Sequence, residues 1–325
     1  MWRWTLAIFC FAMSTVQAAS FTCMAQPQYD DPQEVYRELY KQYQGKHYKQ
    51  VAFLGNRLIT YHADSPVLAN TYFYYGVALF HLAEYAKANT VFSTFLDQYA
   101  LPQFFEETMQ YKFAIAEKFR QGERKRILGI PYAPKWENAT EDAIDIYNEV
   151  IMTLNRDEIA IEAQYHKAGL LVVNNQWKEG IECYQSLIRK YPKHPLSAES
   201  YLAVARVYAQ QAKIRHPDVQ IVELAEMNFK RFLVDYPTSQ SLRDMEGLLV
   251  SVKDRFAKEL WDSADFFVRK KNSVASAVLY YKLLIQKYPE TSYAMGAVNQ
   301  LHAWKSAYPE DIASFLDNSP IAASP

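Results

Sequence analysis

The stretch Leu187-Ile188-Arg189-Lys190-Tyr191-Pro192 returns twice along this chain of 325 residues, as Phe232-Leu233-Val234-Asp235-Tyr236-Pro237 and as Leu284-Ile285-Gln286-Lys287-Tyr288-Pro289. Each copy places two apolar residues and a Tyr at positions i, i+1 and i+4, on one face of a helix. The Pro ends that helix, because it has no N–H and disfavours helical geometry in the residue before it. A helix ending that recurs about every 50 residues predicts repeated helical units, and such arrays bind partners along an extended surface.

The residues ahead of each ending fit the tetratricopeptide pattern. This pattern has small residues where two helices touch, an aromatic residue four positions after an Ala, and a Pro that closes a unit of about 34 residues. The matches are Gly76, Tyr85, Ala88 and Phe92; Ala168, Trp177, Gly180, Tyr184 and Pro192; Ala225, Phe229 and Pro237; and Ala277, Tyr281 and Pro289. Several matches in register favour a repeat array over an ordinary helical bundle.

The composition is typical of an all-helical chain, since Gly is scarce at 9 residues while half of the residues are apolar. Apolar periodicity predicts helices over 32–44, 47–62, 66–82, 84–99, 103–120, 139–155, 158–175, 177–191, 195–213, 218–236, 240–271, 273–288 and 291–307. We therefore predict an all-α fold, a tetratricopeptide-type helical-repeat solenoid of about six helix pairs over residues 32–310. A disordered tail is expected over 311–325.

The first residues have the pattern of a secretory signal peptide. Arg3 precedes an apolar run that is shorter than the roughly 20 residues needed to span a bilayer, and small residues precede a cleavage point after Ala18. We expect a signal peptide over 1–18 and a linker over 19–31.

Cys23 provides a second possible cleavage point, because bacterial lipoproteins are cut directly before the Cys that carries their lipid. The residues in front of it, Ser20-Phe21-Thr22, match the usual lipoprotein pattern poorly. An acylated Cys23 is therefore one of two alternatives for the mature N-terminus. Cys183 is interpreted as a small core residue, and no disulfide framework is expected.

The sequence has no motif that points to catalysis. It has no phosphate-binding Gly loop, no Cys-x-x-Cys and no His-Glu-x-x-His, and its seven His residues are spread mostly one to a helix or turn. The formal net charge of -1 argues against a nucleic-acid-binding protein, which carries a basic stripe. We therefore expect a protein-binding chain that is not an enzyme and uses no cofactor, metal or nucleic acid.

A segment between Arg120 and Trp136 interrupts the third helix pair. It begins with basic residues and continues with an apolar stretch that contains turn residues. Long loops with apolar content are often functional or folded back on the body. We predict a partner-contact loop with Arg124, Lys125, Arg126 and Tyr132, and the alternative is a solvated loop that caps the neighbouring helix.

Four adjacent aromatic residues, Tyr72-Phe73-Tyr74-Tyr75, cover every face of one predicted helix. Some of them must therefore face a groove or solvent, and Tyr suits peptide contacts because it is large, rigid and amphipathic. We predict a groove with Tyr72, Tyr74 and Tyr75, while two of the four residues are expected to pack in the core.

Three elements of the C-terminal third carry a resemblance to a known family. They are Val252-Lys253-Asp254-Arg255-Phe256-Ala257-Lys258-Glu259, Ala264-Asp265-Phe266-Phe267 and Lys287-Tyr288-Pro289-Glu290-Thr291. Their order and spacing resemble the BamD family, which comprises tetratricopeptide lipoproteins of the machinery that folds β-barrels into the bacterial outer membrane.

The resemblance implies a periplasmic scaffold on the inner face of the outer membrane, which binds barrel-assembly subunits and unfolded barrel clients. It implies partner contacts at Lys253, Asp254, Arg255, Lys258 and Glu259. The chain departs from the family in its poor lipoprotein pattern, its sixth helix pair and its basic insertion. A periplasmic tetratricopeptide adaptor for cell-envelope division or a secretion system is therefore the alternative function.

Overall fold

The computed structural model describes residues 31–99, 103–130, 132–155, 157–214, 218–271 and 273–306, together with Ile312. The expected signal peptide, Cys23, the expected linker before Asp31, and the expected tail apart from Ile312 lie outside these residues.

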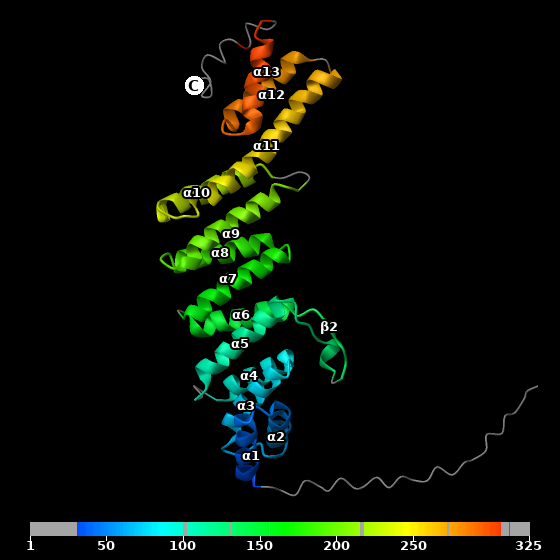
Figure 1. Cartoon of the computed structure of the whole chain (residues 1–325), viewed down its shortest axis with the longest axis vertical. Coiled ribbons are helices and arrows are strands. Elements are labelled where there is room, and N and C mark those ends of the chain that lie inside the picture. Colours follow the sequence, from blue (N-terminus) through cyan, green and yellow to red (C-terminus); the bar gives the residue numbers. More distant parts are fainter. Residues whose placement is uncertain are drawn as a thin grey trace, which may run out of the picture. The chain divides into compact units, whose positions relative to one another are not determined.

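Helices make up nearly all of the described structure (Figure 1). They are α1 (Pro32–Gln44), α2 (Tyr48–Tyr61), α3 (Leu68–His81), α4 (Tyr85–Gln98), α5 (Phe105–Arg120), α6 (Thr140–Leu154), α7 (Glu158–Val173), α8 (Trp177–Lys190), α9 (Pro195–Gln211), α10 (Gln220–Asp235), α11 (Leu242–Lys271), α12 (Val274–Lys287) and α13 (Ser292–Trp304). The prediction of an all-α, tetratricopeptide-type repeat fold is confirmed.

The chain divides into two compact units. One comprises Met1–Ala83 and Thr90–Pro102, and the other comprises Glu84–Asn89 and Gln103–Pro325. In the first unit α1 packs on α2 and α2 packs on α3. In the second, each helix from α5 to α13 packs on the next, and α7, α9 and α11 also contact one another in sequence. Contact both with the next helix and with the helix after it is the packing expected of stacked helix pairs.

Small residues allow the paired helices to approach closely, as the repeat pattern predicts. A Cβ atom added at Gly76 would lie 2.4 Å from the Phe92 ring, and one at Gly180 would lie 2.7 Å from Val172. Phe92 is fully buried. The helices could not hold this spacing with larger side chains at the two Gly positions.

The Tyr-Pro endings close their helices in the same way. Tyr191, Tyr236 and Tyr288 follow α8, α10 and α12, and their φ angles are -131°, -136° and -134°. Each backbone N–H still donates to the carbonyl oxygen four residues earlier. The Pro that follows disfavours helical geometry in the Tyr, so the helix stops at the residue before the Tyr.

No helix in the described part of the chain has the length and apolar character needed to cross a membrane. Among the described residues, no group of three or more His, Cys, Asp or Glu side chains is arranged to hold a metal ion. Cys183 is a free, half-buried thiol that packs against the core of the second unit.

Candidate partner-binding sites

Lys253 on α11 has a different position from the one expected of a partner contact. Its Nζ atom lies 2.8 Å from Glu226 of α10 and also pairs with Glu290, which follows α12. The side chain is only 12% exposed. Burial alone lowers the pKa of Lys253, but the hydrogen bonds to the two carboxylates outweigh burial and raise it. The charge of Lys253 is thus engaged within the chain, where it joins α11 to α10 and to the turn after α12.

The other residues of this α11 segment divide into an inward and an outward group. One carboxylate oxygen of Asp254 is buried, and no described residue donates a hydrogen bond to it. Arg255 pairs with Glu259 at 2.9 Å, and Lys258 pairs with Asp262 at 2.5 Å. Both pairs are partly exposed and join residues four apart on the helix. Arg255, Lys258 and Glu259 therefore remain available to a partner.

The predicted aromatic groove is largely part of the core. Tyr74 and Tyr75 are only 8% and 4% exposed. The ring of Tyr43 on α1 lies 4.6 Å from that of Tyr74, and the Tyr75 hydroxyl donates to Asn56 on α2. This corrects the expectation for Tyr74 and Tyr75, since α1 and α2 cover the faces of α3 on which they lie. Tyr72 is half-buried and remains a candidate for client contact.

The insertion between α5 and α6 folds into a small hairpin that projects from these helices (Figure 1). Strand β1 (Lys125–Arg126) pairs antiparallel with β2 (Lys135–Glu137), and a 3-10 turn (Ile127–Gly129) follows β1. These strands were not expected from the sequence, because they are too short to show the alternation of apolar and polar residues that identifies a strand.

Ion pairs attach the hairpin to the helices. Arg126 lies 2.5 Å from Glu84, and Lys125 lies 2.7 Å from Asp142 on α6. The hydrogen bond from Arg126 is the largest cause of the lowered pKa of Glu84. The two predicted contact residues Lys125 and Arg126 are thus engaged within the chain.

The outer part of the hairpin presents aromatic rings to solvent. Tyr132 is 98% exposed, and Trp136, which the sequence analysis did not select, is also exposed. Arg124 is exposed as well and donates to the backbone carbonyl of Trp136. Of the predicted loop contacts, Arg124 and Tyr132 are therefore accessible.

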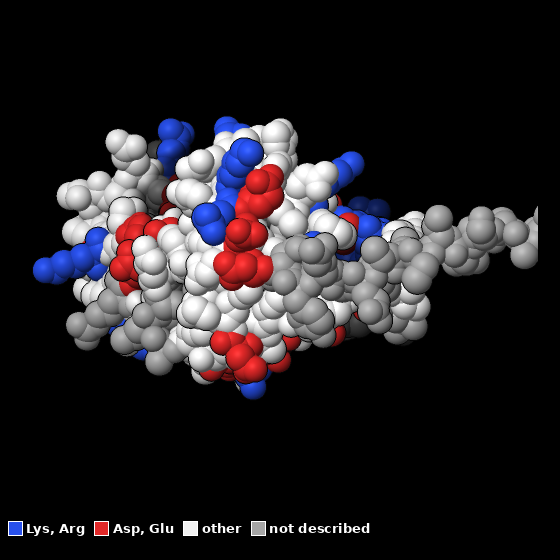
Figure 2. All heavy atoms as spheres, turned by 90° about the horizontal axis from the view of Figure 1, so that it is seen from below, with Lys and Arg blue, Asp and Glu red and all other residues white. Residues whose placement is uncertain are grey.

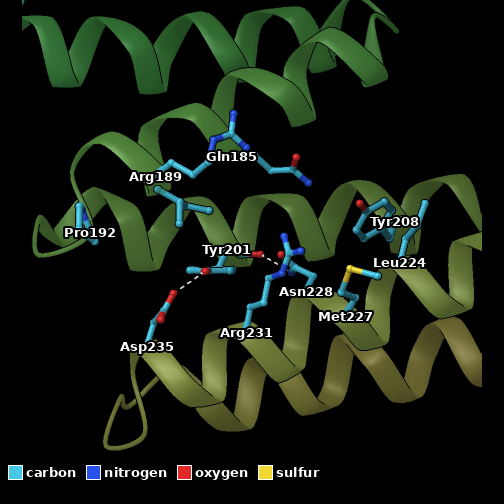
Figure 3. A pocket seen from close by; sticks show the side chains of 11 residues that line it. Gln185, Arg189, Pro192, Tyr201, Tyr208, Leu224, Met227, Asn228, Arg231 and Asp235 are labelled. Carbon is cyan, nitrogen blue, oxygen red and sulfur yellow. Dashed lines mark hydrogen bonds between the residues drawn. The ribbon is translucent and has the colours of Figure 1, made fainter.

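A pocket of about 280 Å³ lies among α8, α9 and α10 (Figure 3). Its buried surface includes Tyr201, Tyr208 and Asn228. The Tyr201 hydroxyl donates to Asp235 at 2.6 Å, and Asn228 donates to the Tyr201 backbone carbonyl at 3.0 Å. This pocket leaves no signal in the sequence, because its residues come from three helices and form no linear motif.

Charges of both signs lie side by side on the face shown in Figure 2. Among the described residues on that face, no extended patch of a single sign is visible. The described residues on this face likewise show no basic stripe of the kind that nucleic-acid binding requires.

The repeat fold places the chain in the class of tetratricopeptide-type helical-repeat proteins. A family model described as "YfiO: Outer membrane lipoprotein" matches residues 141–308, which is more than half of the chain. The chain therefore belongs to this family of outer membrane lipoproteins.

Two similar proteins from Xylella fastidiosa, strains 9a5c and Temecula1, are each named outer membrane protein assembly factor BamD. Each is 28% identical to this chain over 149 residues, which are 45% of this chain and 48% of the relative. The match thus spans about half of the relatives' length. Together with the family assignment, it confirms the resemblance to the BamD family.

Two solved structures resemble the fold at low sequence identity. A tetratricopeptide repeat protein from Parabacteroides merdae is 11% identical with a TM-score of 0.37, and the alignment covers 88% of this chain and 98% of that one. The pilF protein of Pseudomonas aeruginosa is 13% identical with a TM-score of 0.32, and the alignment covers 77% and 97%.

Proposed function

We propose that this protein is a scaffold of outer-membrane β-barrel assembly, which binds partner subunits on the periplasmic side of that membrane. The observation that supports the proposal is the family match over 141–308, which includes all of α11. The two Xylella fastidiosa relatives, which match 149 residues of this chain, are named assembly factors. On α11 the outward residues Arg255, Lys258 and Glu259 provide the partner contacts.

The energetics of α11 suit such a contact. Exposed ion pairs between residues four apart stabilise a helix by only about 0.3–0.5 kcal/mol, so a partner can replace them at little cost. Lys253, two residues before Arg255, fixes α11 through its ion pairs with Glu226 and Glu290. The outward side chains are thus presented from a firmly packed base, which lowers the entropy lost on binding.

We also propose that acylation of Cys23 anchors this scaffold to the membrane. Tyr72 contributes to the binding of unfolded clients. Mass spectrometry of the mature protein tests the anchor. An acylated N-terminal Cys23 supports it, whereas a mature chain that begins with unmodified Ala19 contradicts it. A Cys23→Ser variant should then appear in the soluble periplasmic fraction.

Co-purification tests the assembly function. The full-length protein is isolated from detergent-solubilised membranes of its source, and the bound proteins are identified by mass spectrometry. Recovery of an outer-membrane barrel-assembly subunit is the expected result. Recovery of a division protein or a secretin without that subunit would instead favour the periplasmic adaptor, the alternative function.

Charge reversal on α11 then locates the contact. Arg255→Glu combined with Lys258→Glu should reduce recovery of the assembly subunit at least about tenfold, equivalent to about 1.4 kcal/mol. A matched control reverses Arg243 and Arg269, two exposed Arg residues on the same helix. Equal recovery with both double variants would exclude the outward face of α11 as the contact.

A further inference from the structure

The pocket among α8, α9 and α10 has an apolar end that no described residue covers. Leu224 and Met227 on α10 line this end and are 42% and 47% exposed. Beside them lies the buried ring of Tyr208 (Figure 3). Exposed apolar side chains next to a buried aromatic surface favour an apolar side chain as the occupant.

The same pocket is lined by two guanidinium groups. Arg189 comes from α8, and Arg231 rises from α10 toward α8 (Figure 3). Both are exposed, and neither forms a hydrogen bond or ion pair with any described residue. Asp235 is the acidic residue of the lining, and its carboxylate accepts the hydroxyl proton of Tyr201. The lining thus carries a net positive charge, and both guanidinium groups can bind an anion.

We propose that this pocket binds a short internal segment of a partner polypeptide in which an apolar side chain stands next to an acidic one. The apolar side chain enters between Leu224, Met227 and Tyr208. The neighbouring carboxylate reaches Arg189 and Arg231, whose planar guanidinium groups match a carboxylate with two parallel hydrogen bonds.

The open wall of the pocket favours a peptide segment over a free small molecule. Sites for small ligands bury most of the ligand surface, whereas this pocket of about 280 Å³ has the exposed residues Leu224 and Met227 in its wall. A volume of this order holds one or two side chains, and the rest of the partner can lie on α8 and α10.

The buried surface of the pocket is formed before any partner arrives. The bond from Asn228 to the Tyr201 carbonyl and the bond from Tyr201 to Asp235 fix both side chains across α9 and α10. Pre-formed anchor sites bind more tightly because little is ordered on association. None of these residues belongs to the α11 contact, so this site can be tested independently of the proposed role in barrel assembly.

Fluorescence anisotropy with a labelled, C-terminally amidated peptide tests the proposal. The probe is Gly-Ser-Leu-Phe-Asp-Glu-Leu-Ser-Gly, and its control has Asn-Gln in place of Asp-Glu. The full mature chain should bind the acidic peptide about tenfold more tightly than the amide control, and added salt should reduce the difference.

Two variants separate the charge contribution from the apolar one. With Arg189→Glu and Arg231→Glu together, the preference should change to a peptide with Lys-Lys in place of Asp-Glu. Met227→Ser, which removes the apolar side chain without adding charge, should weaken binding of the acidic and amide peptides alike. Lys230→Glu, which reverses the charge of one exposed neighbour that does not line the pocket, should leave binding unchanged.

Some results would overturn the proposal. Equal binding of the acidic and amide peptides by the unaltered chain would do so, as would equal losses from Lys230→Glu and from the double Arg variant. Tight binding that required a free C-terminal carboxylate would assign the pocket to chain ends instead of internal segments. Circular dichroism of each variant shows whether it has folded.

Discussion

The hydroxyl of Tyr236 donates a hydrogen bond of 2.5 Å to the backbone carbonyl of Pro192. Both residues belong to Tyr-Pro endings, one after α10 and the other after α8. One unit earlier, the hydroxyl of Tyr191 donates to the carbonyl of Asn155 at the end of α6. The Tyr of these two endings therefore joins its unit to the preceding one, in addition to ending its own helix.

Tyr236→Phe tests this coupling, because it removes the hydroxyl and keeps the ring. We expect a loss of about 1 kcal/mol in the free energy of unfolding, the usual contribution of one hydrogen bond. Urea denaturation followed by circular dichroism measures it. Tyr132→Phe is the control, since the Tyr132 side chain is almost fully exposed. Equal stability of the two variants would show that the Tyr236 bond contributes nothing.

Glu117 on α5 predicts a dependence of stability on pH. Its carboxylate lies 2.5 Å from His166 Nδ1 and 2.6 Å from Arg120 Nη2, and it also accepts from the Tyr147 hydroxyl. Burial alone raises the pKa of Glu117, but these hydrogen bonds outweigh burial and lower it from 4.5 to about 2. A pKa lowered by folding means that the carboxylate stabilises the protein above about pH 4.5 and loses this effect as the pH falls toward 2.

Glu117→Gln should therefore destabilise the protein by about 2 kcal/mol at pH 7, as expected for a lost charge-assisted hydrogen bond. The difference from the unaltered chain should shrink between pH 4.5 and 2. Urea titrations across this range measure it, with Glu182→Gln on an exposed face of α8 as the control. A difference that stays constant down to pH 2 contradicts the assignment.

Replacement of two helical Gly residues by Ala should change the stability of the protein in opposite directions. At Gly76 the new methyl group would lie 2.4 Å from the buried Phe92 ring, so Gly76→Ala should cost about 1–3 kcal/mol. At Gly247 in α11 nothing lies within 4 Å, so Gly247→Ala should stabilise the helix by about 0.5–1 kcal/mol. Thermal unfolding of both variants checks the prediction. It fails if the melting temperatures of the two variants shift in the same direction.

The helix positions could be predicted because their signals are local. Pro32 and Pro195 stand at the first position of α1 and α9, and Asp157 caps α7. Tyr-Pro ends α8, α10 and α12. Sites built from tertiary contacts could not be predicted in this way. The burial of Tyr74 depends on the rings that α1 places against it, and the pocket beside Arg231 depends on how three helices pack.

The hairpin provides a last prediction. The Glu84 carboxylate forms ion pairs with both Arg126 at 2.5 Å and Lys135 at 3.5 Å. These bonds attach each strand of the hairpin to the turn before α4. Glu84→Gln removes the charge and should loosen the hairpin, so that its backbone amides exchange about tenfold faster, equivalent to about 1.4 kcal/mol of local stability.

Hydrogen-exchange mass spectrometry of peptides that cover residues 124–137 measures this change. Glu123→Gln is the matched control, because Glu123 is exposed at the base of the hairpin and, among the described residues, forms no ion pair with its strands. Faster exchange with Glu84→Gln alone shows that Glu84 holds Tyr132 and Trp136 in place. If exchange is unchanged in both variants, the Lys125–Asp142 pair is sufficient to attach the hairpin, and the stabilising role of Glu84 is rejected.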